Sequence, residues 1–357
     1  MASRLFTPLT LKSITLKNRI VVSPMCQYSS VDGFANDWHL VHLGSRAVGG
    51  AALIIAEATA ISPEARISPQ DLGIWKDEHI EKLKQITDFI SAQGTVPGVQ
   101  LAHAGRKAST YPAWKGRGQV PLSEGGWKTL GPSPIPFHEK EDAPLELNSE
   151  GIKKVVADFA TAAERAFEAG FKVIEIHAAH GYLVHQFLSP LSNQRSDEYG
   201  GSFENRTRIL LEIIDAVNVT WPDNLPVFVR ISATDWAEGG WNPDESARLA
   251  QILTDKGISV IDVSSGGLAS HQKIQVGPSY QVPFSARIKK ETNSLTGAVG
   301  LITNAEQAEE ILQNNEADLI VMAREFLRDP YFPLHAAHQL GDDVTWPVQY
   351  DRAKPAL

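Results

Sequence analysis

Cysteine is the scarcest residue in this 357-residue chain, which has one, and no apolar run is long enough to span a membrane. A single cysteine cannot form an internal disulfide, which suits a reducing compartment. A transmembrane helix needs roughly 20 consecutive apolar residues. The first residues, Met-Ala-Ser-Arg-Leu-Phe, also lack the apolar core of a secretory signal. We therefore expect a cytoplasmic protein with no membrane span.

Clusters of basic residues are absent as well. The formal net charge is −9, and no block of like charges interrupts the chain. Nucleic acids and anionic membranes require a concentrated basic face, so neither is expected as a partner. The dinucleotide fingerprint GxGxxG and the Walker A loop are also missing. With 43% hydrophobic and 21% charged residues, the composition is that of a soluble globular protein.

Short apolar segments typical of strands alternate with segments of helical periodicity. The predicted strands are Ile20–Val22, Leu53–Ala58, Val96–Leu101, Val173–His177, Val227–Ile231, Val260–Val263, Leu295–Val299 and Leu319–Met322. The predicted helices are Asp37–Val48, Asp77–Ala92, one capped by Ser149, Phe203–Val219, Asp244–Lys256, Ala286–Thr292, Asn304–Asn314 and Glu325–Leu340. Such alternation indicates parallel strands.

Two α/β architectures fit this alternation. A doubly wound sheet would carry a glycine-rich nucleotide turn after its first strand, but Pro24-Met25-Cys26 stands there. We therefore predict a (β/α)8 TIM barrel formed by residues 1–357 as one domain. A β-hairpin within residues 5–19 is expected to close one end. The long loop after the third strand, residues 105–147, is rich in Pro, Gly and Trp, and its length indicates a functional segment or a lid.

Two histidines and a tyrosine follow the fourth predicted strand. His177, His180 and Tyr182 lie where that strand ends, and the carboxyl end of a barrel strand carries the chemistry. Imidazole N–H groups and a phenol could bind a carbonyl or nitro oxygen and deliver a proton beside it. A zinc site and a purely structural role are the alternatives. The zinc site lacks a helical Glu, a Cys or an evident third ligand.

Charged and glycine-rich positions at other strand ends indicate an anionic cofactor. Arg230 lies inside a buried strand, so it needs an anion, an electron-rich ring or a barrel carboxylate such as Glu175. Gly297-Ala-Val-Gly300 and Ala323-Arg324 follow the last two strands, where barrels often bind phosphate through backbone N–H groups. A cofactor phosphate is therefore predicted at this point of the rim.

Five motifs occur in order along the chain. They are Ser23-Pro-Met-Cys26-Gln-Tyr28, Gln100-Leu-Ala-His-Ala-Gly-Arg-Lys107, His177-Ala-Ala-His-Gly-Tyr182, Tyr199-Gly-Gly-Ser-Phe-Glu-Asn-Arg206 and Thr296-Gly-Ala-Val-Gly300. Together they make the chain resemble the old yellow enzyme family of FMN-dependent ene-reductases. It is most similar to the bacterial thermophilic-like branch of NADPH dehydrogenases and xenobiotic reductases, and the similarity runs nearly end to end.

The resemblance implies noncovalent FMN at the barrel mouth, NADPH as hydride donor and activated alkenes as acceptors. It assigns no metal. Many relatives have Gly where Ala323 stands, so phosphate binding there requires a negative φ. The implied cofactor residues are Ser23, Pro24, Met25, Cys26 and Ala58 along the flavin ring, Gln100 and Arg230 at its pyrimidine side, and Gly300, Ala323 and Arg324 around the phosphate.

The same resemblance assigns the substrate side of the site. His177 and His180 are expected to donate hydrogen bonds to the acceptor oxygen, and Tyr182 to protonate the α-carbon. Tyr28 would shape the pocket. Cys26 would tune the flavin, although an inert buried filler is the usual role of a lone cysteine. A dienoyl-CoA reductase type of FMN barrel would need iron–sulfur and dinucleotide domains for which this chain has no room. A barrel that merely binds a ligand is the third alternative.

The C-terminal tail, residues 341–357, has no apolar periodicity of its own. By resemblance, it would reach a neighbouring subunit and place Arg352 in that subunit's pocket, which implies a homodimer or homotetramer. A solvated chain end is the alternative.

Overall fold

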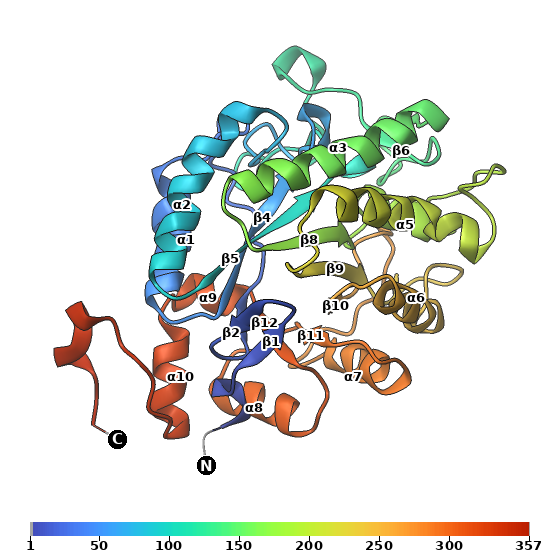
Figure 1. Ribbon diagram of the computed structural model, residues 1–357. Coiled ribbons are helices and arrows are strands. Elements are labelled where there is room, and N and C mark those ends of the chain that lie inside the picture. Colours follow the sequence, from blue (N-terminus) through green and yellow to red (C-terminus); the bar gives the residue numbers. More distant parts are fainter. Residues whose placement is uncertain (1–2, 357) are drawn as a thin grey trace.

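Eight parallel strands form a closed barrel in the computed structural model, which describes residues 3–356 (Figure 1). The predicted (β/α)8 architecture is confirmed. The order around the barrel is β10-β11-β12-β3-β4-β5-β8-β9. The strands are β3 (Ile20–Val22), β4 (Leu53–Ala60), β5 (Val96–Ala102), β8 (Val173–Ala178), β9 (Val227–Ser232), β10 (Val260–Ser264), β11 (Thr296–Ala298) and β12 (Leu319–Met322).

Helices surround the barrel because each carries an apolar stripe that the outer faces of the strands bury (Figure 1). In α3, for example, Ile152, Val155 and Phe159 are buried at helical spacing. The helices are α1 (Asp37–Val48), α2 (Ile80–Ala92), α3 (Ser149–Glu168), α4 (Leu183–Leu188), α5 (Phe203–Thr220), α6 (Pro243–Asp255), α7 (Val282–Glu291), α8 (Ala305–Gln313), α9 (Arg324–Arg328) and α10 (Phe332–Leu340). None of the helices within residues 3–356 is both long and apolar enough to cross a membrane.

The N-terminal hairpin closes the amino end of the barrel, as predicted. Strands β1 (Leu9–Leu11) and β2 (Ile14–Leu16) pair antiparallel. Leu11 and Leu16 pack in one buried cluster with inward-facing residues such as Val173, Phe228 and Val260. The bottom of the barrel interior is therefore apolar.

Several predicted boundaries were wrong. The cap of α3 is Asn148, whose Oδ1 accepts a hydrogen bond from the Gly151 N–H at 2.8 Å, and not Ser149. The helical turns predicted over Glu325–Leu340 form two helices, α9 and α10, because Pro330 between them has no N–H for a helical bond. Strand β4 continues to Ala60 through an irregularity at Glu57, so Ala58 lies within the strand.

Candidate active site

The carboxyl rim of the barrel brings the two predicted histidines and the tyrosine together. Strand β8 ends just after His177, and the chain then turns through Gly181. The ring centres of His177 and His180 lie 5.2 Å apart, and those of His177 and Tyr182 lie 5.0 Å apart, both edge to face. Three polar side chains therefore line one small region, as the sequence predicted.

Buried hydrogen bonds fix the turn that carries these side chains. His180 and Gly181 both have left-handed backbones, with φ of 57° and 72°. The His180 N–H donates to Ser232 Oγ at 2.9 Å, and the Gly181 N–H donates to His185 Nδ1 at 2.9 Å. The Gln186 side-chain amide donates to the Gly181 carbonyl at 2.7 Å. The neighbouring strand β9 and helix α4 thus hold the turn in place.

A second layer behind this turn was not predicted. His185 Nε2 lies 2.8 Å from Asp235 Oδ1, and both side chains are fully buried. Because His185 Nδ1 accepts from the Gly181 N–H, the ring proton lies on Nε2, next to the carboxylate. Asp235 also accepts from Ser189 Oγ at 2.6 Å and from the Trp241 N–H at 2.7 Å. In the sequence, a His within the mostly apolar stretch Leu183–Leu188 was a weak signal for this pair.

Burial keeps both rim histidines neutral. Desolvation, and then the nearby Arg230 cation, hold the pKa of His177 and of His180 well below the ordinary value. His177 Nδ1 accepts from the Ala179 N–H at 3.2 Å, so its proton is on Nε2. His180 Nε2 lies 2.7 Å from Ser264 Oγ. Burial also raises the pKa of Tyr182, so its phenol stays protonated.

Lys107 borders the same region and was missed as a site residue. Its ammonium donates to the His180 and Gly267 carbonyls, both at 2.8 Å, and lies 5.2 Å from the centre of the Tyr182 ring. Burial lowers its pKa to about 8. It also lies 4.5 Å from the Phe137 ring, and Trp114 meets Tyr28 edge to face at 5.6 Å. The 105–147 loop therefore borders the pocket, as expected of a functional segment.

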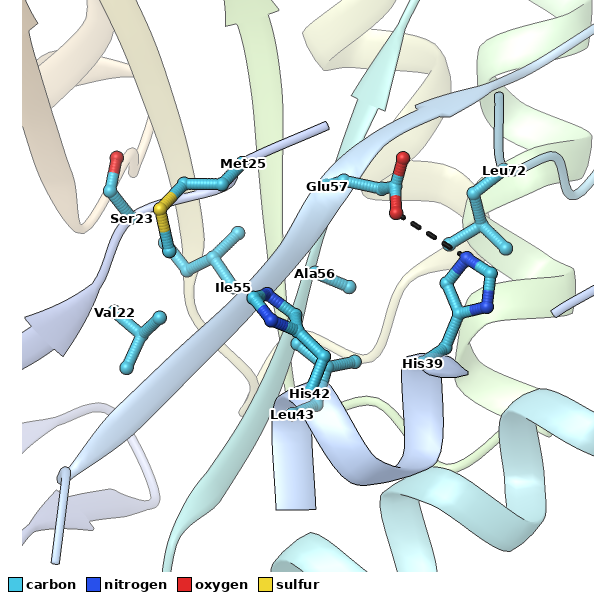
Figure 2. Close-up of a pocket in the computed structure, with 10 residues that line it drawn as sticks. All are labelled: Val22, Ser23, Met25, His39, His42, Leu43, Ile55, Ala56, Glu57 and Leu72. Atoms are coloured by element: carbon cyan, nitrogen blue, oxygen red, sulfur yellow. Dashed lines mark ion pairs between the residues drawn. The ribbon is translucent and has the colours of Figure 1, made fainter. Parts of the chain in front are cut away.

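The segment from Ser23 to Tyr28 is anchored by the buried pair of Glu57 and His39. Glu57 accepts a hydrogen bond from the Gln27 N–H at 3.0 Å and lies 3.4 Å from His39 Nε2 (Figure 2). A cavity of only ≈ 10 Å³ separates Ser23 and Met25 from these side chains, and Figure 2 shows the residues around it. The contact from β4 through Glu57 fixes the backbone next to Cys26.

Cys26 lies in an environment that disfavours the thiolate. Burial, and then the acidic side chains of Asp71 and Glu57, raise the pKa of the Cys26 thiol well above its usual value. Cys26 and Tyr182 pack against the same small apolar cluster, which includes Ala58. Pro24 lies between the Ser23 and Met25 positions that border the cavity. The residues assigned to the flavin after β3, together with Ala58 of β4, are thus gathered next to the rim cluster.

The polar residues assigned to the pyrimidine side lie in the upper barrel interior. Arg230 donates to Ser23 Oγ at 3.0 Å, and its Nε lies 3.2 Å from Asp262 Oδ2. The barrel carboxylate that pairs with Arg230 is therefore Asp262, and the suggestion of Glu175 was wrong. Glu175 instead accepts from the Gln100 side-chain amide at 2.8 Å. Asp262 is directly opposite Arg230 in the strand register, which the sequence alone did not reveal.

A cavity of ≈ 180 Å³ lies at the predicted phosphate position, lined by Gly300, Ala323 and Arg324 among others. Ala323 has φ of −109°, so the methyl group that replaces the glycine of many relatives is accommodated. Gly300 has φ of +130°, and a Cβ there would lie 3.2 Å from Gln281. Arg324 is exposed, and no carboxylate in residues 3–356 pairs with it. A free cation beside a glycine cradle fits a phosphate.

Arg352 is not brought to this site within its own chain. The tail passes through the 3-10 helix η6 (Val348–Ala353) and stands apart from the barrel beyond α10 (Figure 1). Residues 343–349 line a groove with Lys17 and Gly94, which precede strands β3 and β5. The tail therefore starts at the amino end of the barrel, opposite the rim. Within residues 3–356, no three His, Cys, Asp or Glu side chains are grouped so as to hold a metal.

Comparisons with known proteins found similar sequences and similar folds. The model of the NADH:flavin oxidoreductase / NADH oxidase family matches residues 4–343. An NADPH dehydrogenase of Bacillus velezensis is 51% identical over 355 residues, covering 99% of this chain and 100% of that protein. The solved structure of morphinone reductase has a TM-score of 0.79 at 29% identity, covering 97% and 92% of the two chains. The old yellow enzyme homologue from Zymomonas mobilis has a TM-score of 0.79 at 27% identity, covering 99% of each.

Proposed function

Because this chain belongs to the NADH:flavin oxidoreductase / NADH oxidase family, we propose that it is an FMN-dependent NADPH dehydrogenase that reduces activated C=C bonds. The observation that carries the proposal is the cluster of His177, His180 and Tyr182 at the carboxyl rim. Arg230 lies below this cluster, and the phosphate cavity opens on the same rim.

The residues present fit FMN. Gly300, Ala323 and Arg324 would hold its phosphate in the ≈ 180 Å³ cavity. Gln100 and Arg230 would bind the pyrimidine side of the ring. The segment from Ser23 through Cys26, together with Ala58, would lie along the ring. When bound, FMN would supply two-electron hydride chemistry between NADPH and the acceptor, for which ping-pong kinetics are expected.

Each rim residue then has a defined task. Neutral His177 presents its Nε2–H, and His180 presents Nδ1–H when the Ser264 hydroxyl donates to its Nε2. Two such donors stabilise the negative charge that develops on a carbonyl or nitro oxygen during reduction. The protonated phenol of Tyr182 delivers a proton to the α-carbon. The nearby Lys107 ammonium offsets the charge left on the phenolate.

This arrangement favours small acceptors in which an oxygen is conjugated with the double bond, such as enones, maleimides and nitroalkenes. Tyr28, packed against Trp114, would shape the far side of the pocket. Because the tail stands apart from its own barrel, we also propose a homodimer or homotetramer in which Arg352 enters the pocket of a neighbouring subunit. The lone Cys26, held as a thiol, suits a cytoplasmic setting.

The visible spectrum of the purified protein tests the proposal. We expect a flavin absorption band that NADPH bleaches and that an enone restores under anaerobic conditions. Heat denaturation should release FMN into the supernatant, because no covalent bond to the protein is proposed. A panel of enones, maleimides and nitroalkenes, each assayed with NADPH and NADH, would define the substrate class. A protein that binds no flavin after reconstitution with FMN would overturn the proposal.

A further inference from the structure

Two carboxyl groups lie inside the barrel, directly beneath the rim cluster. Glu175 of β8 and Asp262 of β10 are 0% and 1% exposed. Their neighbours along each strand, such as Ile174 and Ile261, belong to the outer apolar layer, so the two carboxyl groups face the interior. The apolar bottom layer that includes Phe228 excludes water from below. Both groups are therefore held in a dry environment.

The surroundings of this pair contain too little positive charge for two carboxylates. Arg230, on the strand between them, pairs with Asp262 at 3.2 Å. The other protein contact is the Gln100 amide, which donates to Glu175 Oε1 at 2.8 Å. Glu175 Oε2 and both Asp262 oxygens are buried and receive no hydrogen bond from any donor in residues 3–356, since the Arg230 contact is an ion pair without a hydrogen bond. His177, which is opposite Arg230 in the strand register, is neutral and adds no positive charge. Two ionised groups would leave one uncompensated negative charge, which is costly in such an interior.

We propose that Glu175 and Asp262 share a single proton, with Glu175 as the acid that donates its hydroxyl to Asp262 and Asp262 as the carboxylate that pairs with Arg230. The proton gives Glu175 Oε2 a partner and makes the net charge of the three side chains zero. Burial raises the pKa of both carboxyl groups, but Arg230 and the hydrogen bond from Glu175 oppose the rise at Asp262, which leaves the proton on Glu175. Burial, and then the charge of Asp262, raise the pKa of Glu175 well above its ordinary value, and hydrogen bonding to Asp262 raises it further.

The shared proton gives Glu175 the role of a positioning residue, a consequence that rests on the proposed function. Its remaining oxygen accepts from the Gln100 amide and so turns the Gln100 carbonyl oxygen away from Glu175. Asp262, kept ionised, fixes the Arg230 guanidinium at the same level. Glu175 and Asp262 thereby orient both side chains assigned to the pyrimidine side of the cofactor, without touching the cofactor themselves.

Infrared spectroscopy of the purified holoenzyme tests the shared proton directly, because a protonated carboxylic acid has a carbonyl-stretch band that ionised carboxylates lack. Spectra would be taken at about pH 9, since burial raises the pKa of Asp71 to about 7 and that group must be ionised. The wild type should show the band, and Glu175→Gln should lose it. Asp262→Asn should lose it too, because Glu175 then becomes the counter-ion of Arg230. No band in the wild type, or a band that survives in Glu175→Gln, would overturn the proposal.

The reduction potential of the bound flavin tests the positioning role. Glu175→Gln keeps both contacts, since its amide can donate to Asp262 and accept from Gln100. Its potential should therefore change by less than about 30 mV, a tenfold change in the two-electron equilibrium. Glu175→Ala should weaken FMN binding at least tenfold, because Gln100 loses its acceptor. If the reduction potential of the flavin shifts more in Glu175→Gln than in Glu175→Ala, the positioning role is refuted. The infrared result stands whatever substrates the enzyme accepts, so it can fail or hold independently of the proposed function.

Discussion

Gly181 is the position at which a single methyl group should disturb the site most. Its φ is +72°, and a Cβ there would lie 2.2 Å from the Gly267 carbonyl oxygen and 2.8 Å from the Leu268 Cα. Both neighbours are backbone atoms, so no side chain can rotate away. Ordinary contact begins at 3.4 Å, so Gly181→Ala must move the two loops apart by about 1.2 Å, the difference between 3.4 and 2.2.

The cost of Gly181→Ala has two parts. A left-handed backbone disfavours alanine by about 1–2 kcal/mol, and overpacking adds about 1–3 kcal/mol. The free energy of unfolding should therefore fall by about 2–5 kcal/mol. The functional loss should be steeper for alkene reduction, because a displacement of about 1 Å at a catalytic group can cost about 100-fold in rate. Flavin reduction by NADPH should suffer less, since His180 and Tyr182 act on the acceptor.

Gly257→Ala is the matched control. Gly257 also has a left-handed backbone, with φ of +86°, but a Cβ there meets no atom within 4 Å, and the residue lies between α6 and β10 at the amino end of the barrel. The free energy of unfolding of this variant should therefore fall only by the cost of the left-handed backbone, about 1–2 kcal/mol. Its turnover should equal that of the wild type. Chemical denaturation and stopped-flow assays of both half-reactions give the comparison. If Gly181→Ala unfolds as easily as Gly257→Ala and reduces enones at the wild-type rate, the steric argument is wrong.

Four further predictions concern the residues assigned to the reaction. His177→Ala and His180→Ala should each slow cyclohexenone reduction by roughly 100-fold or more, as expected for a lost oxyanion donor, and wild-type rates in both would refute the assignment. Tyr182→Phe should slow alkene reduction while quinone-dependent NADPH oxidation continues; equal loss with both acceptors would make Tyr182 structural. Cys26→Ala should retain FMN but shift its potential by about 30 mV, and an unchanged potential with unchanged kinetics would indicate an inert filler. Truncation after Trp346 should raise KM for the alkene and loosen the oligomer while FMN stays bound; a monomer by light scattering with activity insensitive to truncation would contradict the tail assignment.

Much of the fold was predictable because its signals are local. The alternation of short apolar runs and amphipathic helices depends on side-chain periodicity within each segment, which the sequence displays directly. Once the strands were recognised as parallel members of a barrel, their carboxyl ends had to meet at one rim. The grouping of His177, His180 and Tyr182 follows from their position after a single strand, so no long-range information was needed. The boundary errors, such as the Asn148 cap, were limited to one or a few residues.

The rest of the site depends on pairs of residues far apart in the chain. Asp262 rather than Glu175 pairs with Arg230 because of the register between β9 and β10, and the sequence does not state that register. Likewise, His185 meets Asp235 only when the loop after β9 folds against α4.

The sequence by itself thus determined the type of fold and the chemical groups at the rim, because periodicity and position along a strand are properties of short segments. The tertiary structure decided which buried charges face each other, and therefore which are neutralised by a partner and which by a proton. Burial and distance control these electrostatic energies, and both exist only after the barrel has closed. The neutral histidines and the Glu175–Asp262 pair are consequences of that closure.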